Sequence, residues 1–213
     1  MKKILLLLAL SGVLRADDVA LLEIRFVDGS TRRAVIEFFD KEAPGTVANF
    51  KKLARDGFYK GCAFHRAIPG AIVQTGDPLS KRKDRTAVGT GGPGYTQPAE
   101  IRRRHTKGAV AAARIGDKVN PQRRSNGSQF YVCLSQQPQL DGKYTVFGNV
   151  IEGLDVLETI SNRPTDTNDN PVERIILRKV SILPREKLPP ARPTKPGPPG
   201  PAKPPLWRRI WPW

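Results

Sequence analysis

The sequence contains few of the residues that build disulfide frameworks and metal sites. Its 213 residues include only two cysteines, Cys62 and Cys133, and only two histidines. A pair of cysteines cannot supply the several bridges of a disulfide scaffold, and these two lack the spacing of zinc ligands. We therefore exclude a disulfide scaffold and expect no metal site. Whether the two cysteines pair stays open.

The apolar run near the start of the chain is too short to cross a membrane. Lys2 and Lys3 precede apolar residues 4–10, and Ala16 is a small residue ahead of an acidic pair. A membrane helix needs about 20 apolar residues, whereas a short run behind positive charges is typical of a secretory signal peptide. We expect residues 1–16 to be a signal peptide and the protein to be exported, periplasmic or extracellular. The alternatives are an uncleaved anchor and a frayed N-terminus.

Acidic residues are scarce, with 20 Asp and Glu against 36 Lys and Arg, which gives a net charge of +16. Much of this excess lies in residues 185–213, which carry seven Lys or Arg, one Glu, 10 of the 20 prolines and all three tryptophans. Proline fixes φ and removes backbone donors, so we expect this segment to be an extended, disordered arm without a core. The total charge is therefore a poor argument for nucleic-acid binding.

The arm ends in residues 206–213, where tryptophans stand beside Arg208 and Arg209. Tryptophan prefers the interface between a membrane and water, and arginine is attracted to anionic headgroups. We expect the arm to attach the protein to an anionic membrane or envelope polymer. A proline-rich ligand for a partner domain and a solubilising tail are the alternatives.

Residues 17–184 have the pattern of one mainly β domain. Alternating apolar residues on both sides of Asp28 and Gly29 predict a hairpin, and spaced apolar residues predict helices at 44–57 and 154–160. Many short strands with glycine and proline turns predict a closed β-barrel capped by these helices. The further strands are expected at residues 63–68, 71–75, 108–113, 130–134, 145–150 and 175–182.

Some matches to known motifs lack the context that their chemistry needs. Residues 89–94 fit a glycine-rich phosphate loop, but they do not join a strand to a helix. Asp166 opens a calcium-like pattern in which Pro171 replaces the required glycine. Ser128 has no nucleophile-elbow frame. We therefore expect no phosphate loop, no calcium site and no serine nucleophile.

Five segments stand out when they are taken together: Phe64–Gly70, Gln74–Asp77, Gly89–Tyr95, Asn126–Tyr131 and Leu140–Gly148. In this order and at these spacings they resemble the cyclophilin family of peptidyl-prolyl cis-trans isomerases. The resemblance covers about residues 19–183. It implies an antiparallel barrel of about eight strands closed by a helix at each end. It also implies catalysis of rotation about X-Pro bonds in proline-containing polypeptides during protein folding, by a monomer with no cofactor.

The resemblance assigns roles to individual residues. Arg66 matches the catalytic arginine, and Gln74 matches the glutamine that holds the substrate and that arginine. Tyr144 occupies a position that is often histidine, and that is tyrosine in many bacterial members. The residues matched to substrate binding are Phe64, Ile72, Ala113, Arg114, Tyr131, Leu140 and Tyr144. Of these, Ala113 matches the small residue whose backbone pairs with the bound peptide.

This chain departs from the family pattern at several of these positions. Tyr131 replaces a phenylalanine at the base of the proline pocket, and Arg114 replaces an asparagine. Ala71 replaces a phenylalanine that walls the pocket, and Gln139 replaces a tryptophan that helps to bind cyclosporin. The change at Ala71 is expected to widen the pocket, and both changes predict weak binding of cyclosporin.

An arginine suits the reaction that the resemblance implies. Amide resonance opposes rotation with a barrier of about 18–20 kcal/mol. In the twisted state this resonance is lost and the proline nitrogen can accept a hydrogen bond, so a guanidinium aimed at it stabilises that state more than either planar isomer. No nucleophile, metal or cofactor takes part in such a rotation.

Two rival functions belong to other classes. The first is a non-catalytic peptide-binding module with the same fold, which Ala71 favours by widening the pocket and which Arg66 and Gln74 oppose. The second is a nucleic-acid binder that uses the basic residues at 81–85 and 102–104. It lacks the aromatic motifs that read RNA, so we expect no specific nucleic-acid partner.

Overall fold

The computed structural model describes residues 17–190. The expected signal peptide at 1–16, and residues 191–213 of the expected arm, lie outside these residues. The described chain forms a helix α1 (Pro44–Arg55), a helix α2 (Leu154–Ser161) and a set of strands. The strands are β1 (Asp18–Arg25), β2 (Thr31–Phe38), β3 (Arg66–Ile68), β4 (Ile72–Thr75), β5 (Ala109–Ala112), β6 (Phe130–Cys133), β7 (Val146–Glu152) and β8 (Ile176–Pro184).

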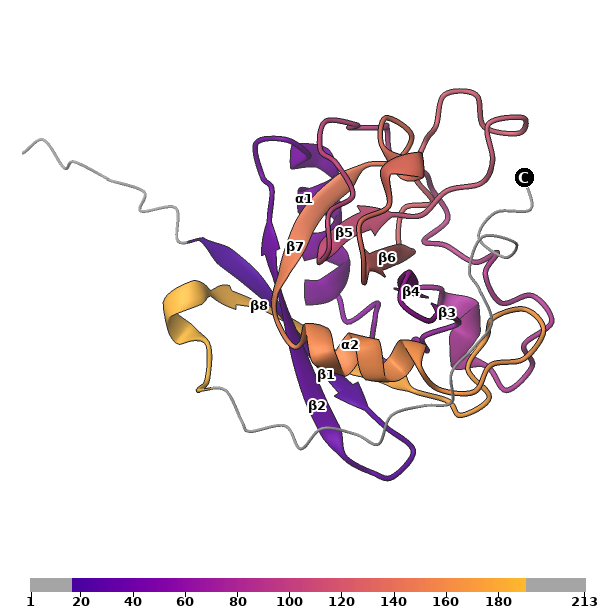
Figure 1. The fold of residues 1–213 in the computed structure, drawn as a ribbon. Coiled ribbons are helices and arrows are strands. Elements are labelled where there is room, and N and C mark those ends of the chain that lie inside the picture. The colour runs from indigo at the N-terminus through magenta and orange to yellow at the C-terminus, as the bar shows by residue number, and fades with distance from the viewer. Residues whose placement is uncertain (1–16, 191–213) are drawn as a thin grey trace, which may run out of the picture.

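The strands form one curled antiparallel sheet in the order β3-β4-β6-β5-β7-β2-β1-β8. Figure 1 shows α1 and α2 apart from each other, each against its own part of this sheet. Helix α1 packs against β7 and β8, and α2 packs against β2, β3 and β4. The mainly β fold, the first hairpin and both helices are therefore confirmed.

The expectation of a closed barrel was wrong, because the sheet is open between β3 and β8. Within residues 17–190 these edge strands share no ladder, and a single bridge joins Ala63 to Ile176. The strand expected at 63–68 is paired with β4 only from Arg66 onward. Before that point the chain turns to β8, where the Phe64 N–H donates to the Ile175 carbonyl at 2.9 Å. Because this pairing covers so few residues, it does not continue the sheet from β8 to β3.

Alternate residues of β4, β5 and β6 face opposite sides of the sheet, as the two-residue period of a strand requires. Val73, Val110 and Val132 point to the interior core, which they share with Phe50 of α1. The ring of Phe50 lies 5.4 Å from that of Phe130, centre to centre. The other set of residues from the same strands forms a separate outer cluster, and that cluster underlies the site described below.

Helix α1 begins at Pro44 without a capping side chain of its own, because Ala43 precedes it. A distant carboxylate replaces the cap. Glu100 accepts hydrogen bonds from the N–H groups of Gly45, at 3.0 Å, and Thr46, at 2.8 Å. An acidic group at this end also interacts favourably with the helix dipole. The loop that contains Glu100 is thereby fixed to α1.

Residues 185–190 pack onto the domain, although the sequence placed them in the expected arm. Leu188 covers the outer apolar cluster of Val19, Leu21 and Val35 on β1 and β2. The Arg33 guanidinium donates to the carbonyl oxygen of Pro189 at 2.8 Å. The composition of residues 185–213 could not reveal this contact, because the residues that Leu188 packs against lie near the other end of the sequence.

The two cysteines are buried and free. Burial raises the pKa of the Cys62 thiol to about 11 and the pKa of the Cys133 thiol to about 12. Both thiols are therefore protonated and unreactive at neutral pH. Residues 17–190 include no cluster of acidic, His and Cys side chains suited to a metal ion. The same part of the chain has no helix long and apolar enough to cross a membrane.

The contact of Leu188 generates a stability prediction. Leu188→Ala uncovers part of the cluster on β1 and β2, and a half-buried leucine contributes about 1 kcal/mol through apolar burial. We expect the free energy of unfolding, measured by urea denaturation, to fall by about that amount. Lys187→Ala is the matched control, since Lys187 is exposed in the same segment. Equal stability of the two variants would show that the segment does not pack on the sheet.

Candidate active site

A row of side chains crosses the outer face of four neighbouring strands. Arg66 on β3 is opposite Gln74 on β4, Gln74 is opposite Tyr131 on β6, and Tyr131 is opposite Ala111 on β5. Directly opposed residues place their side chains on the same face of a sheet. The register therefore brings together an arginine, an amide and an aromatic ring from segments that are distant in sequence.

This row is the floor of a cleft with a volume of about 130 Å³. The cleft contains six of the residues that the sequence assigned to the site and adds some that it did not. Its lining residues are Arg66, Gln74, Gly89, Ala113, Arg114, Ile115, Asn126, Gln129, Tyr131 and Tyr144. Both expected catalytic residues therefore face the same concave surface as the expected pocket aromatics.

Arg66 is a partly buried cation at one side of the cleft. Its side chain is 18% exposed, and its Nε lies 4.0 Å from Oδ2 of Asp169. Burial lowers the pKa of the Arg66 guanidinium, and Asp169 acts in the opposite direction. Because an arginine pKa begins above about 12, the group stays charged at any physiological pH. The cleft therefore holds a permanent, oriented hydrogen-bond donor.

An amide network fixes Gln74 beside this arginine. Gln74 Nε2 donates to Gln129 Oε1 at 2.8 Å, and His65 Nε2 lies 3.2 Å from the same oxygen. Gln129 Nε2 donates in turn to the carbonyls of Gly89 and Gly91, each at 2.8 Å. These donations set which end of the Gln129 amide faces Gln74. Sequence reasoning missed Gln129, although it lies within the Asn126–Tyr131 segment that carried the resemblance.

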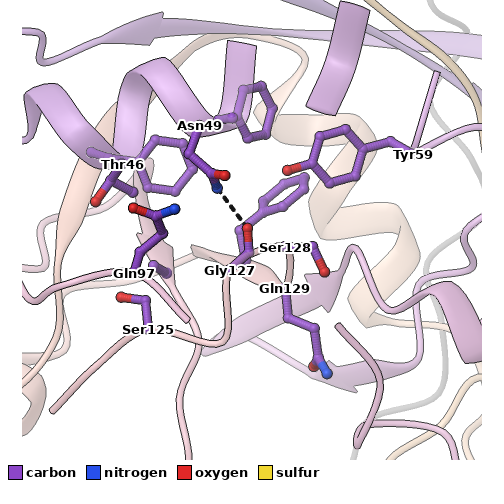
Figure 2. Close-up of a pocket in the computed structure, with 12 residues that line it drawn as sticks. Thr46, Asn49, Tyr59, Gln97, Ser125, Gly127, Ser128 and Gln129 are labelled. Atoms are coloured by element: carbon purple, nitrogen blue, oxygen red, sulfur yellow. Dashed lines mark hydrogen bonds between the residues drawn. The ribbon is translucent and has the colours of Figure 1, made fainter. Parts of the chain in front are cut away.

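Helix α1 is joined to the segment that carries Gln129, beside a second, smaller pocket. Figure 2 shows Asn49 of α1 pointing to Gly127, whose carbonyl accepts a hydrogen bond from Asn49 Nδ2 at 2.6 Å. Asn49 Oδ1 accepts from the Tyr95 hydroxyl at 2.7 Å. Gly127 has φ of +100°, and an added Cβ would lie 2.5 Å from the Tyr95 carbonyl. Only glycine fits at this position. Gln129, which lines the cleft, follows two residues later.

Arg114 is a second cation in the cleft, and its Nε and Nη1 are already engaged within the domain. Its guanidinium lies 4.4 Å from the centre of the Tyr144 ring and 2.6 Å from Oδ1 of Asp117. Its Nε donates to the Lys143 carbonyl at 2.9 Å. With a side chain only 3% exposed, Arg114 serves as a wall that holds Tyr144 in place.

Some residues assigned to substrate binding lie elsewhere. The expected place of Phe64 in the substrate site is corrected: Phe64 belongs to the interior core. The chain leaves the sheet face before Arg66 and pairs with the start of β8 instead. Ile72 and Leu140 are buried in the outer cluster that packs around Tyr131, and they do not line the cleft. They support its floor from below.

Ala113 lines the cleft, and its backbone N–H and carbonyl each make a hydrogen bond within the domain. Its N–H donates to the Gln129 carbonyl at 2.9 Å, and its carbonyl accepts from the Asn126 N–H at 2.8 Å. Both groups therefore hold the segment that carries Gln129. Ala71 is also buried in the outer cluster and does not line the cleft.

The basic loop at 81–85 is partly tied to the protein. Lys81 Nζ donates to the Phe58 carbonyl at 2.7 Å, and Arg85 Nη1 donates to the Pro171 carbonyl at 2.7 Å. Cations that bind backbone carbonyls have fewer donors left for phosphate groups. Lys81 and Arg85 therefore hold the loop against the domain, whereas Arg82 and Lys83 are exposed.

Comparisons with known proteins agree on one family. The model of the cyclophilin type peptidyl-prolyl cis-trans isomerase/CLD family matches residues 24–182. A peptidyl-prolyl cis-trans isomerase of Synechococcus elongatus is 45% identical over 130 residues, which is 60% of this chain and 81% of the relative. Peptidyl-prolyl cis-trans isomerase B of Bacillus subtilis is 43% identical over 129 residues, which is 59% of this chain and 81% of the relative.

Solved structures agree with the sequence matches. A cyclophilin type isomerase of Cryptosporidium parvum, crystallised in the presence of the dipeptide Ala-Pro, has a TM-score of 0.64 and 31% identity. The match covers 76% of this chain and 98% of that one. This chain therefore belongs to the cyclophilin-type peptidyl-prolyl cis-trans isomerase family. A catalytic isomerase is supported over a peptide-binding module without catalysis.

Proposed function

We propose that Arg66 carries the isomerisation of X-Pro bonds in polypeptide clients, with Gln74 as its partner. The observation behind this proposal is the row on the outer face, in which the charged donor of Arg66 and the amide of Gln74 adjoin the aromatic floor of Tyr131. A proline ring is apolar and rigid, so it fits an aromatic floor, while the peptide bond beside it reaches the arginine.

The reaction forms and breaks no covalent bond between heavy atoms, so the protein must only favour the twisted peptide over the planar one. In the twisted state the proline nitrogen regains its lone pair, and the Arg66 guanidinium donates to it. Gln74, held by Gln129, binds the peptide and keeps it from turning as a whole. Only the bond between the fixed proline and its neighbour is left to rotate. This differential stabilisation lowers the barrier.

All the groups in this scheme come from one chain, so we propose that the enzyme acts as a monomer. Proline-containing polypeptides that are still folding are the clients, because proline isomerisation takes tens of seconds and limits the rate of folding. The Ala-Pro dipeptide present with the Cryptosporidium parvum relative is a minimal form of such a client.

Loss of the guanidinium is the direct test of this scheme. Arg66→Ala is expected to lower kcat/KM for a proline-containing peptide by about 10²–10³-fold, the effect of removing one transition-state donor. Arg66→Lys keeps the charge without the planar fork and should retain part of the activity. Arg82→Ala, at an exposed arginine outside the cleft, is the matched control. Turnover of a folded Arg66→Ala protein at the control rate would refute the assignment.

We further propose that this is an exported bacterial enzyme. The charged and apolar composition of residues 1–16 supports export, and strand β1 begins only at Asp18, so removal of those residues spares the whole sheet. The relatives from Synechococcus elongatus and Bacillus subtilis are consistent with a bacterial source.

Export predicts a defined N-terminus. Cleavage after Ala16 should give a secreted protein that starts at Asp17, which intact-mass spectrometry can read directly. A full-length chain recovered from the cytoplasm would count against both the signal peptide and the location. Changing Lys2 and Lys3 to Glu should retain the protein in the cell, because the positive start of a signal peptide is needed for its orientation.

We also propose that residues 191–213 attach the enzyme to an anionic surface through their tryptophans and basic residues. The docking of residues 185–190 on β1 and β2 sets the start of this attachment beyond Pro190. In co-sedimentation, the full chain should bind vesicles with anionic headgroups and not neutral ones, and a chain ending at Pro190 should bind neither. Equal recovery of both chains in the supernatant would make a partner ligand the better explanation of the arm.

A further inference from the structure

The floor of the cleft contains a polar group that needs an explanation. Tyr131 is only 1% exposed, and its ring lines the surface assigned above to the proline ring. Its phenol carries a hydroxyl, which is costly to bury without a hydrogen bond. Burial raises the pKa of the Tyr131 phenol, so the group keeps its proton at neutral pH. The direction of that proton decides how polar the floor is.

His105 lies beside this hydroxyl in a fully buried position. Its Nε2 is 3.0 Å from the Tyr131 oxygen, and its Nδ1 is 3.0 Å from Oδ1 of Asp141. Asp141 also accepts the backbone N–H of His105 at 2.7 Å. The three side chains form a continuous chain of hydrogen bonds from the edge of the outer cluster to the floor of the cleft.

The position of each proton follows from the pKa directions. Burial acts to raise the pKa of Asp141, but hydrogen bonds from the His105 backbone and ring hold it below its usual value, so the carboxylate is ionised. An ionised carboxylate only accepts, so His105 Nδ1 carries a hydrogen. Burial lowers the pKa of His105 despite the opposing effect of Asp141, so the ring is neutral and Nε2 carries a lone pair. The Tyr131 hydroxyl must then donate to Nε2.

Ring packing holds this arrangement in place. The rings of His105 and Tyr131 are nearly parallel, at 8°, with centres 6.1 Å apart. Tyr144 stands edge-on to Tyr131, at 85° and 5.9 Å. The Tyr131 ring therefore has a defined orientation, and its hydroxyl hydrogen is directed toward His105 and away from the cleft.

We propose that His105, oriented by Asp141, is a positioning residue that allows a tyrosine to serve as the floor of the proline site. By accepting the hydroxyl hydrogen, His105 leaves only the ring face of Tyr131 to the substrate. Without that acceptor the buried hydroxyl would lack a partner, which is costly, so the Tyr131 ring would have to shift to reach one. Such a shift would change the surface on which the proline ring packs and slow the rotation. This inference rests on the proposed function of the cleft.

A double-mutant cycle tests the inference. His105→Asn keeps a donor close to the position of Nδ1 for Asp141 and loses the acceptor for Tyr131, while Tyr131→Phe removes the hydroxyl itself. We expect His105→Asn to lower kcat/KM roughly fivefold in the Tyr131 background, the size of one net hydrogen bond, and to have less than about half that effect in the Tyr131→Phe background. Equal losses in both backgrounds would overturn the inference and show a purely structural role.

A second measurement does not depend on activity. Nitrogen-15 chemical shifts of the histidine rings in the full chain should show His105 as the neutral tautomer with its hydrogen on Nδ1 at pH 7. A hydrogen on Nε2 would overturn the inference even if the enzyme is active. If the unmodified protein has no isomerase activity, the proposed function fails while the tautomer still reports on the hydrogen-bond chain. Near-UV circular dichroism of each variant verifies that it is folded.

Discussion

The register of β3, β4, β6 and β5 is the constraint on which the rest of the site depends. Because side chains alternate between the two faces of a strand, a slip of one residue would turn Arg66, Gln74 and Tyr131 into the interior and bring valines out. The interior set of Val73, Val110 and Val132 prevents this slip, since those side chains lose their burial in any other register. Packing of the core thus fixes the chemistry on the opposite face.

Local signals made much of this fold predictable from the sequence. The hairpin around Asp28 and Gly29 and the helix that begins at Pro44 depend on short-range turn chemistry and periodicity, and both are present. The resemblance assigned Phe64 to substrate binding beside Arg66, yet Phe64 lies in the interior because the chain changes its strand partner between them. Whether the sheet closes into a barrel, and where Leu188 packs, likewise depend on contacts between distant parts of the chain. No local sequence pattern encodes such contacts.

The residues of the site divide in the same way. Arg66 and Gln74 stand in short segments that the family resemblance identifies, and the structure brings both into the cleft. Gln129 and His105 were missed, because their importance comes from what they contact: the Gln74 amide for one and the Tyr131 hydroxyl for the other. Glu100 is a similar case, since its capping of α1 appears only once the chain has folded.

The docking of residues 185–190 also has a consequence for how clients reach the enzyme. This segment lies on the outer face of β1 and β2, toward one edge of the sheet, whereas the cleft is built on the strands toward the other edge. The chain therefore leaves the folded domain from its rear. An attachment through the residues beyond Pro190 would leave the cleft facing away from the attached surface. Unfolded client chains could then enter the cleft without displacing that attachment.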